Sequence, residues 1–259
     1  MAFRRAQPAR VRDHVVRARD TRGELVGHAF CRIDPEDDET PDLLGVSVCV
    51  HPDHRRRGVG TLLLEHLVAF GRANGRTRLT SWTTSQVPAG SAFAEAHGAR
   101  AVSLGRVNHL AVADVDRAEL ERWVREGPAR APGYELIGWD GPTPDEHLAA
   151  FADLYHVMND APLDDLETND SIFTPALIRD WEQGVAALGG EVWTLVARAP
   201  DGGLAGMHSI RIMHDWPEVT DIRTGNADSN AAMMGINTAM GYVPLMATTT
   251  FELVVKPGV

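Results

Sequence analysis

The residues best suited to chemistry in this sequence lie close together, between positions 51 and 61. Three consecutive arginines, Arg55–Arg57, are followed by Gly58 and Gly60. A glycine has no side chain to keep an anion away from the main-chain N–H groups, so both positions allow close approach. The arginines would add positive charge around the same turn. The segment therefore predicts a binding site for a ligand that carries a diphosphate.

The segments on either side of this turn are suited to hold it in place. Residues 46–50 form an apolar run that ends at His51-Pro52, which is typical of a strand. A leucine-rich stretch over 62–70 follows the glycines and indicates a helix. A helix beginning there directs its free N–H groups and its dipole at the turn. We therefore expect a strand, a phosphate-sized turn and a helix in direct succession.

The glycine spacing separates this turn from two common nucleotide sites. It matches neither G-x-G-x-x-G nor the P-loop with its Gly-Lys-Ser/Thr, so it favours neither NAD nor ATP. It instead resembles the central motif of the GNAT superfamily of acyl-CoA-dependent N-acyltransferases, V-x-V-x-P-x-x-[Q/R]-x-x-G-x-[G/A]. The matching residues are Val48, Val50, Pro52, Arg55, Gly58 and Gly60.

The resemblance implies a site for acetyl-CoA or another acyl-CoA as co-substrate. The pantetheine arm would lie along Val48, Cys49 and Val50 like an added strand. The pyrophosphate would lie on the main-chain amides of the turn, and the side chains of Arg55–Arg57 would contribute positive potential. The amides concerned are those of Arg56, Arg57, Gly58, Val59, Gly60 and Thr61. The implied activity moves an acetyl or other short acyl group to the amine of a small molecule.

The residues for proton transfer are not identified by the sequence. His51 and His54 lie near the motif and could act as a general base, although a structural role suits each of them as well. The family often places a tyrosine in the helix after the fifth strand to protonate the leaving thiolate. The aligned positions hold Ala94 and Asn237. Two alternatives therefore stay open: a non-catalytic CoA sensor or structural GNAT-like protein, and acyl transfer to a hydroxyl.

The element pattern of the first half follows the GNAT order from its second strand onward. Only about ten residues precede its first hairpin, so we expect this half to lack the initial strand and helix pair that normally form much of the acceptor site. We expect a hairpin turn at Asp20–Gly23, the motif strand and helix, a strand over Leu79–Trp82, a helix from Pro88 to Gly98, and a last hairpin turning at Gly105.

The pattern restarts after residues 127–133, which are rich in Gly, Pro and Ala. The fold class expected is α/β with mixed sheets: two tandem GNAT-like domains, each a mostly antiparallel mixed sheet flanked by helices. The N-terminal domain would span 1–126, the linker 127–133 and the C-terminal domain 134–259. The arrangement is similar to tandem acyltransferases such as mycothiol synthase.

The second half lacks a recognisable CoA turn, because its hairpin at Asp201–Gly203 passes after Met207 almost directly to Ile210–His214, which resembles the end of a helix before the closing elements. Those closing elements include an Asn226–Asn230 segment and a helix that ends before Gly241. Upstream we expect a strand over Tyr134–Trp139, a helix over Asp145–Asn159, and a helix over Pro175–Leu188 with Trp181 and Leu188 on its apolar side.

Composition limits the remaining possibilities. A net charge of −11 over 259 residues argues against a nucleic-acid binder, and no apolar run reaches the roughly 20 residues that cross a bilayer. Met1–Arg5 lacks the apolar core of a secretory signal. Cys31 and Cys49 lie in apolar runs, which predicts buried reduced thiols and a cytoplasmic location. His208 and His214 lack partnering ligands, so no metal site is expected.

Overall fold

The computed structural model describes residues 11–35, 40–187, 189, 192–208 and 219–255. Contacts divide the chain into two compact units. The N-terminal unit comprises Ala9–Arg106, Leu163–Asn169 and Met246–Val259. The C-terminal unit comprises Met1–Pro8, Val107–Pro162 and Asp170–Leu245. Each unit therefore contains segments from distant parts of the sequence.

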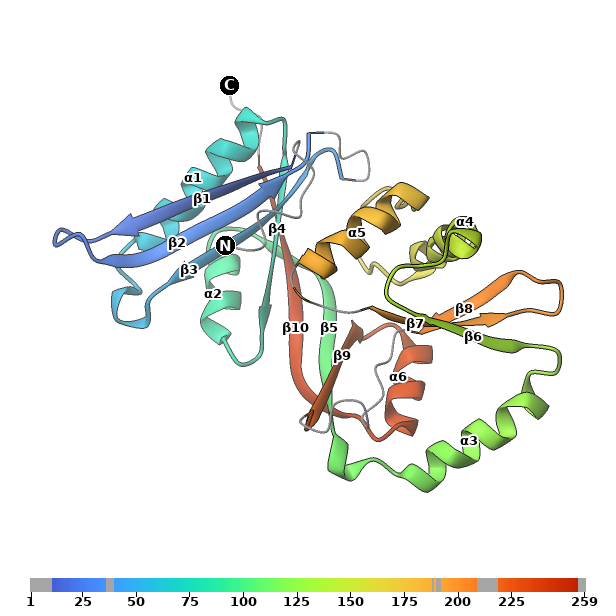
Figure 1. The fold of residues 1–259 in the computed structure, drawn as a ribbon. Helices are drawn as coiled ribbons and strands as arrows, with labels where there is room; N and C mark the ends of the chain where they lie inside the picture. Colours follow the sequence, from blue (N-terminus) through green and yellow to red (C-terminus); the bar gives the residue numbers. More distant parts are fainter. Residues whose placement is uncertain (1–10, 36–39, 188, 190–191, 209–218, 256–259) are drawn as a thin grey trace. The chain divides into compact units, whose positions relative to one another are not determined.

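A seven-stranded mixed sheet has the order β1-β2-β3-β4-β10-β5-β9, and β1 to β4 with most of β10 and β5 belong to the N-terminal unit (Figure 1). β1, β2 and β3 pair antiparallel, β3 pairs parallel with β4, and β4 pairs antiparallel with β10. This mostly antiparallel sheet confirms the expected fold class. The strands are β1 (Arg12–Arg19), β2 (Leu25–Ile33), β3 (Leu43–Val50), β4 (Arg78–Thr84), β10 (Val243–Val254) and β5 (Arg100–Ala111).

The first hairpin forms where the sequence places it. The Asp20 carboxylate accepts from the main-chain N–H groups of Arg22 and Glu24, each at 2.9 Å. Gly23 adopts a φ of +83°, which a side chain would disfavour. The turn thus uses the Asp and Gly chemistry of tight hairpins.

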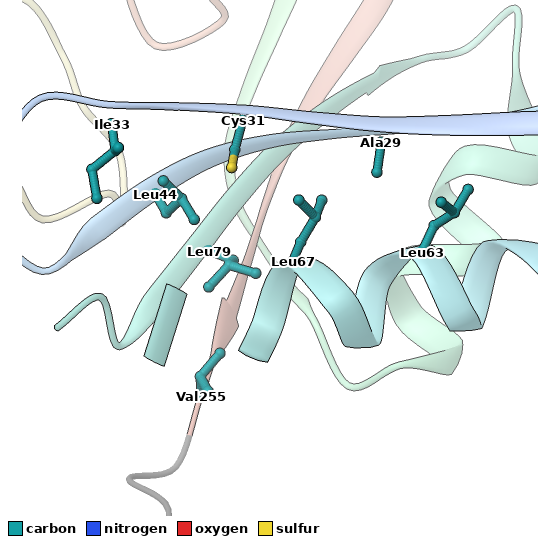
Figure 2. Packing of buried hydrophobic residues seen from close by; sticks show 8 residues of the cluster. All are labelled: Ala29, Cys31, Ile33, Leu44, Leu63, Leu67, Leu79 and Val255. Carbon is teal, nitrogen blue, oxygen red and sulfur yellow. The ribbon is translucent and has the colours of Figure 1, made fainter. Parts of the chain in front are cut away.

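Helix α1 (Val59–Ala73) covers one face of this sheet and closes its core. Leu63 and Leu67 are fully buried and point from α1 toward Ala29 and Cys31 on β2 (Figure 2). Their spacing of four residues places both on one helix face, and burying each leucine contributes about 1.5–3 kcal/mol. This packing fixes the start of α1 directly after β3.

One expectation for this unit is wrong. Gly105 makes no hairpin turn, because β5 continues without a break from Arg100 to Ala111. The strand expected to return beside it is replaced by β10, from the end of the chain, which lies between β4 and β5 (Figure 1). Residues Thr248–Val254 pair with Thr84–Arg78. A strand from the C-terminus therefore completes the sheet of the N-terminal unit.

The C-terminal unit contains a three-stranded sheet, β6-β7-β8, whose pairs are antiparallel. Phe151, Ala152, Ile178 and Val196 form its core. The expected strands, helices and hairpin are present, and Asn230 caps the last helix by accepting from Met233 N at 3.1 Å. The elements are η3 (Val112–Asp114), α3 (Arg117–Arg130), β6 (Glu135–Asp140), α4 (Asp145–Tyr155), η4 (His156–Asp160), α5 (Pro175–Ala187), β7 (Trp193–Arg198), β8 (Leu204–His208), β9 (Asp221–Ala227) and α6 (Ala231–Ala239).

The buried face of α5 differs from the one expected. Ile178 and Glu182 are its buried residues, whereas Trp181 is 46% exposed. Glu182 is held inside by the main-chain N–H of Thr143 and by Arg179, both at 2.8 Å. These two hydrogen bonds satisfy the carboxylate, so Glu182 can be buried on the inner face of α5 while Trp181 is not.

The helix α3 extends four residues into the segment expected to be a linker. Asp116 caps its start by accepting from Glu119 N, and Pro128 lies within its last turn. The N–H of Ala131 still reaches the carbonyl of Gly127 at 3.0 Å, so the helix closes after the proline. The domain limits at 126 and 134 remain a prediction, since the compact units exchange segments and are defined by contacts.

Among the described helices, none is both long enough and apolar enough to cross a membrane.

Candidate functional site

The turn between β3 and α1 has an unusual backbone. After the short helix η2 (Pro52–His54), Arg56 adopts a φ of +58° and Gly58 a φ of +81°. The left-handed region costs a residue with a side chain about 1–2 kcal/mol, and such residues gather at functional sites. The ideal Cβ position at Gly58 faces open space. The turn is therefore strained and open to solvent on one side.

Within the described part of the chain, the main-chain N–H groups over 56–61 have no hydrogen-bond partner. Among the hydrogen bonds of the described residues, none has a main-chain donor from 56–61, while Leu62 N donates to Gly58 O at 3.0 Å. Gly58 is the N-cap of α1 and offers no side chain to accept from the first N–H groups. These donors, together with the positive end of the helix dipole, make an anion-binding site.

The edge of β3 that faces β4 is open beyond residue 45. The two parallel strands pair only over Leu43–Gly45 and Arg78–Thr80. On the other edge, His51 N donates to Val26 O at 2.9 Å. Since successive residues of a strand direct their peptide groups to opposite edges, Cys49 faces β2 and Val48 and Val50 face the open edge.

Arg55 ties the turn to the strand. Its Nε donates to the carbonyl of Val50 at 3.1 Å, so this carbonyl is occupied. The groups left for a ligand at the open edge are the N–H and C=O of Val48 and the N–H of Val50. Arg56 and Arg57 are exposed at the turn. Arg55 thus has a structural contact in addition to its charge, which the sequence pattern could not show.

A cavity of about 360 Å³ adjoins this open edge, within the N-terminal unit. Its walls come from β3, β4, β10, α1 and the helix α2 (Pro88–Ala96), and they are mostly apolar. Such a lining, with a few hydroxyl groups, suits a long flexible ligand of low charge. The lining residues are Val46, Val48, Leu64, Leu79, Ser81, Trp82, Thr83, Thr84, Val87, Gly90, Phe93, Ala94, His97, Ala99, Phe251 and Leu253.

Two residues of the cavity wall connect it to the turn. A Cβ on Gly60 would lie 3.0 Å from Cε2 of Phe93, so only glycine fits there without moving the ring. His97 Nε2 lies 3.1 Å from Thr61 Oγ1, and its Nδ1 lies 2.8 Å from the carbonyl of Phe93. Two side chains of the cavity wall therefore lie against the first turn of α1, where the unpartnered N–H groups lie.

The structure brings together all residues of the predicted phosphate turn but separates the two predicted histidines from the cavity. His51 caps η2, where its Nδ1 accepts from Asp53 N at 3.3 Å, and its ring contacts that of His54 edge to face. Neither lines the cavity. A catalytic role for either remains a prediction. Ala94, at the position of the family tyrosine, does line the cavity.

The cysteines differ from the expectation in one respect. Cys31 is buried, which raises the pKa of its thiol to about 11. Cys49 is exposed, because it lies between the inward-facing Val48 and Val50 and so points to the other face of the sheet. The prediction of a buried Cys49 is therefore wrong.

The corresponding position in the C-terminal unit is part of an amide network. Asn237 is buried and donates to Asn226 Oδ1 at 3.0 Å, and Asn108 donates to the same oxygen at 3.2 Å. The segment 209–218, where a second phosphate turn would be sought, and His214 lie outside the described residues. The expected lack of a second CoA turn thus remains a prediction.

Comparison with known proteins shows what the first part of the chain is similar to. Residues 3–99 match the Acetyltransferase (GNAT) family. The chain is 34% identical over 119 residues to the mycothiol acetyltransferase of Saccharopolyspora erythraea, a match that covers 42% of this chain and 38% of that protein. The match thus spans well under half the length of this curated relative.

Solved structures show the same fold over nearly the whole chain. A tandem GNAT protein from the clavulanic acid biosynthesis pathway superposes with a TM-score of 0.76 at 22% identity, covering 98% of this chain and 86% of that one. A GCN5-related N-acetyltransferase from Sphaerobacter thermophilus gives a TM-score of 0.62 at 14% identity, with coverages of 95% and 82%. Residues 3–99 therefore carry a match to the GNAT family, and the whole chain has the fold of a solved tandem GNAT protein.

Proposed function

We propose that this protein is an acyl-CoA-dependent N-acyltransferase whose N-terminal unit binds the coenzyme. The observation that carries the proposal is the set of unpartnered main-chain N–H groups over 56–61, next to an open strand edge. An acyl-CoA has a diphosphate that could bind these N–H groups and an amide-containing arm that could pair with the strand edge. The match to the GNAT family supports the same ligand.

The reaction would use the open edge of β3 to hold the thioester. The arm would pair with the main-chain groups of Val48 and Val50, and one of their N–H groups would stabilise the oxyanion of the tetrahedral intermediate. The neutral amine of the acceptor would attack the thioester carbonyl carbon. The C–S bond would then break, the attacking nitrogen would lose a proton to give the amide, and the leaving thiolate would take up a proton. The acyl donor would be acetyl-CoA or another short acyl-CoA, and the acceptor a small molecule.

Gly58→Glu tests this site. The new carboxylate and its bulk would occupy the place of the diphosphate, so CoA affinity should fall by more than a hundredfold. Gly75→Glu is a matched control, because Gly75 has a φ of +73° and its Cβ position is also open. It follows the far end of α1, about 22 Å away by helix rise, so the control carries similar strain without touching the turn.

The readouts are CoA binding by calorimetry and thiol release from acetyl-CoA across a panel of small amines. Thermal melts should show equal destabilisation of both variants, with binding lost in Gly58→Glu alone. Unchanged CoA affinity in Gly58→Glu would contradict the site.

A second candidate, a non-catalytic CoA sensor, is favoured by one observation. The position of the family tyrosine holds Ala94, and the described residues that line the cavity include no carboxylate. Tight CoA binding without thiol release for any acceptor would favour the sensor. Product identification by mass spectrometry would separate transfer to an amine from transfer to a hydroxyl.

A further inference from the structure

His97 connects the wall of the cavity to the first turn of α1. Its Nε2 lies 3.1 Å from the hydroxyl oxygen of Thr61, and its Nδ1 lies 2.8 Å from the carbonyl of Phe93. Thr61 is the third residue of α1, and its main-chain N–H belongs to the unpartnered group described above. Because helical side chains lean toward the helix N-terminus, its hydroxyl lies toward the proposed diphosphate site.

The chemistry of these contacts fixes which atoms donate. A carbonyl only accepts, so His97 Nδ1 carries a hydrogen whether the ring is neutral or charged. In the neutral ring Nε2 has no hydrogen, and Thr61 must donate its O–H to it. In the charged ring Nε2 donates, so Thr61 accepts and its own hydrogen becomes available for another acceptor.

We propose that His97 acts through Thr61 as a positioning residue that couples binding of the coenzyme diphosphate to uptake of one proton. With His97 neutral, the Thr61 hydroxyl presents only lone pairs to the diphosphate. With His97 charged, the hydroxyl donates to the anion, and the imidazolium adds a positive charge behind it. The inference rests on the proposed function, because it requires the diphosphate to lie at this turn.

No neighbouring charge competes for this histidine among the described contacts. The residues that line the cavity include no Asp, Glu, Lys or Arg, so β3, β4 and β10 present no charged group to it there. On the two helices that meet at His97, the charged residues nearest in sequence to the contact are Glu95 on α2 and Glu65 on α1. Arg57 lies just before the start of α1. No ion pair joins His97 to any of the three in the described part of the chain. The diphosphate would therefore be the main charge that faces His97.

The experiment measures dephospho-CoA binding by calorimetry between pH 5.5 and 8.5. This probe keeps the diphosphate but lacks the 3′-phosphate, which titrates in the same range. A hydrogen bond to a charged group is worth enough to change affinity about tenfold or more. We expect at least tenfold weaker binding at pH 8.5 than at pH 5.5. Measurements at pH 6.5–7 in two buffers of different ionisation heat should show net proton uptake.

Three variants test whether His97 and Thr61 cause the pH dependence of binding. His97→Gln keeps an N–H donor at every pH, so binding should lose its pH dependence. Thr61→Val removes the hydroxyl and should give weak binding with a shallower profile, whereas Thr61→Ser keeps the hydroxyl and should restore the slope. Thermal melts confirm that each variant is folded, and the two threonine variants suffice if His97→Gln does not fold.

A flat profile in the unchanged protein, or a slope that persists in both His97→Gln and Thr61→Val, would overturn the coupling while leaving the proposed function in place. Absence of binding of either dephospho-CoA or CoA to the unchanged protein at any pH would instead refute the proposed function, and this inference with it.

Discussion

A proline at position 48 tests the direction of the peptide groups along β3. Val48 should direct its N–H to the open edge, since His51 donates to Val26 on the other edge and the residues between alternate. Val48→Pro therefore removes no hydrogen bond of the sheet, and proline is tolerated at a strand edge. The N–H offered to the ligand is lost, and the pyrrolidine ring occupies its place.

The magnitudes follow from these contacts. Val48 packs against the core, and losing about one methyl group of that packing costs about 1 kcal/mol, or about 2–4 °C in Tm. Losing one hydrogen bond to the pantetheine arm costs about 1 kcal/mol, and the ring adds a steric clash. CoA affinity should therefore fall at least tenfold while the fold survives.

Cys49→Pro is the matched control for this substitution. Cys49 pairs with His28 and directs its peptide groups toward β2, so a proline there removes a ladder hydrogen bond. Because proline in the middle of a sheet removes a ladder hydrogen bond, Cys49→Pro should lower the stability more than Val48→Pro does. The assays are thermal melting and calorimetry with CoA. Equal destabilisation of the two variants, or wild-type CoA affinity in Val48→Pro, would refute the reasoning about the open edge.

Three further predictions follow from other parts of the structure. Gly60→Ala should weaken CoA binding several-fold and lower Tm by a few degrees, because its Cβ would lie 3.0 Å from the ring of Phe93; an unchanged Tm would mean that the ring moves freely. Iodoacetamide at pH 8 should alkylate Cys49 and spare Cys31, whose pKa burial raises to about 11, so mass spectrometry of the native protein should show one added group rather than two. The hydrogen bond from His109 on β5 lowers the pKa of Asp221. The stability that this carboxylate contributes is therefore present above its ordinary pKa and is lost as the pH falls through the lowered value. Thermal melts between pH 2 and 5 should show a shallower acid dependence for Asp221→Asn than for the unchanged protein, and identical curves would contradict that contribution.

Local features of the chain could be predicted from the sequence because they depend on neighbouring residues. The strand that ends at Val50, the left-handed turn at Gly58 and the helix that follows lie within about 25 residues, and each uses a residue type with one strong preference. The hairpin at Asp20 formed as expected for the same reason.

Features that depend on distant residues could not be predicted. The strand β10 pairs residues 248–254 with 78–84, so nothing in the sequence around Gly105 signals that its neighbour comes from the chain's end. The contact between Thr61 and His97 joins residues 36 positions apart. A single histidine before Gly98 is typical of an ordinary helix end, so the sequence gives no sign of this contact. The exposed Cys49 follows from the two-residue alternation of β3, which the sequence does contain.

The central claim is that the main-chain N–H groups of residues 56–61 hold a coenzyme diphosphate. A crystal structure of the protein grown with acetyl-CoA tests it most directly. The account predicts diphosphate oxygens within hydrogen-bonding distance of the amides of Gly58 to Thr61, with the pantetheine arm along Val48. Acetyl-CoA bound elsewhere, with this turn occupied only by solvent or by the protein's own side chains, would contradict it.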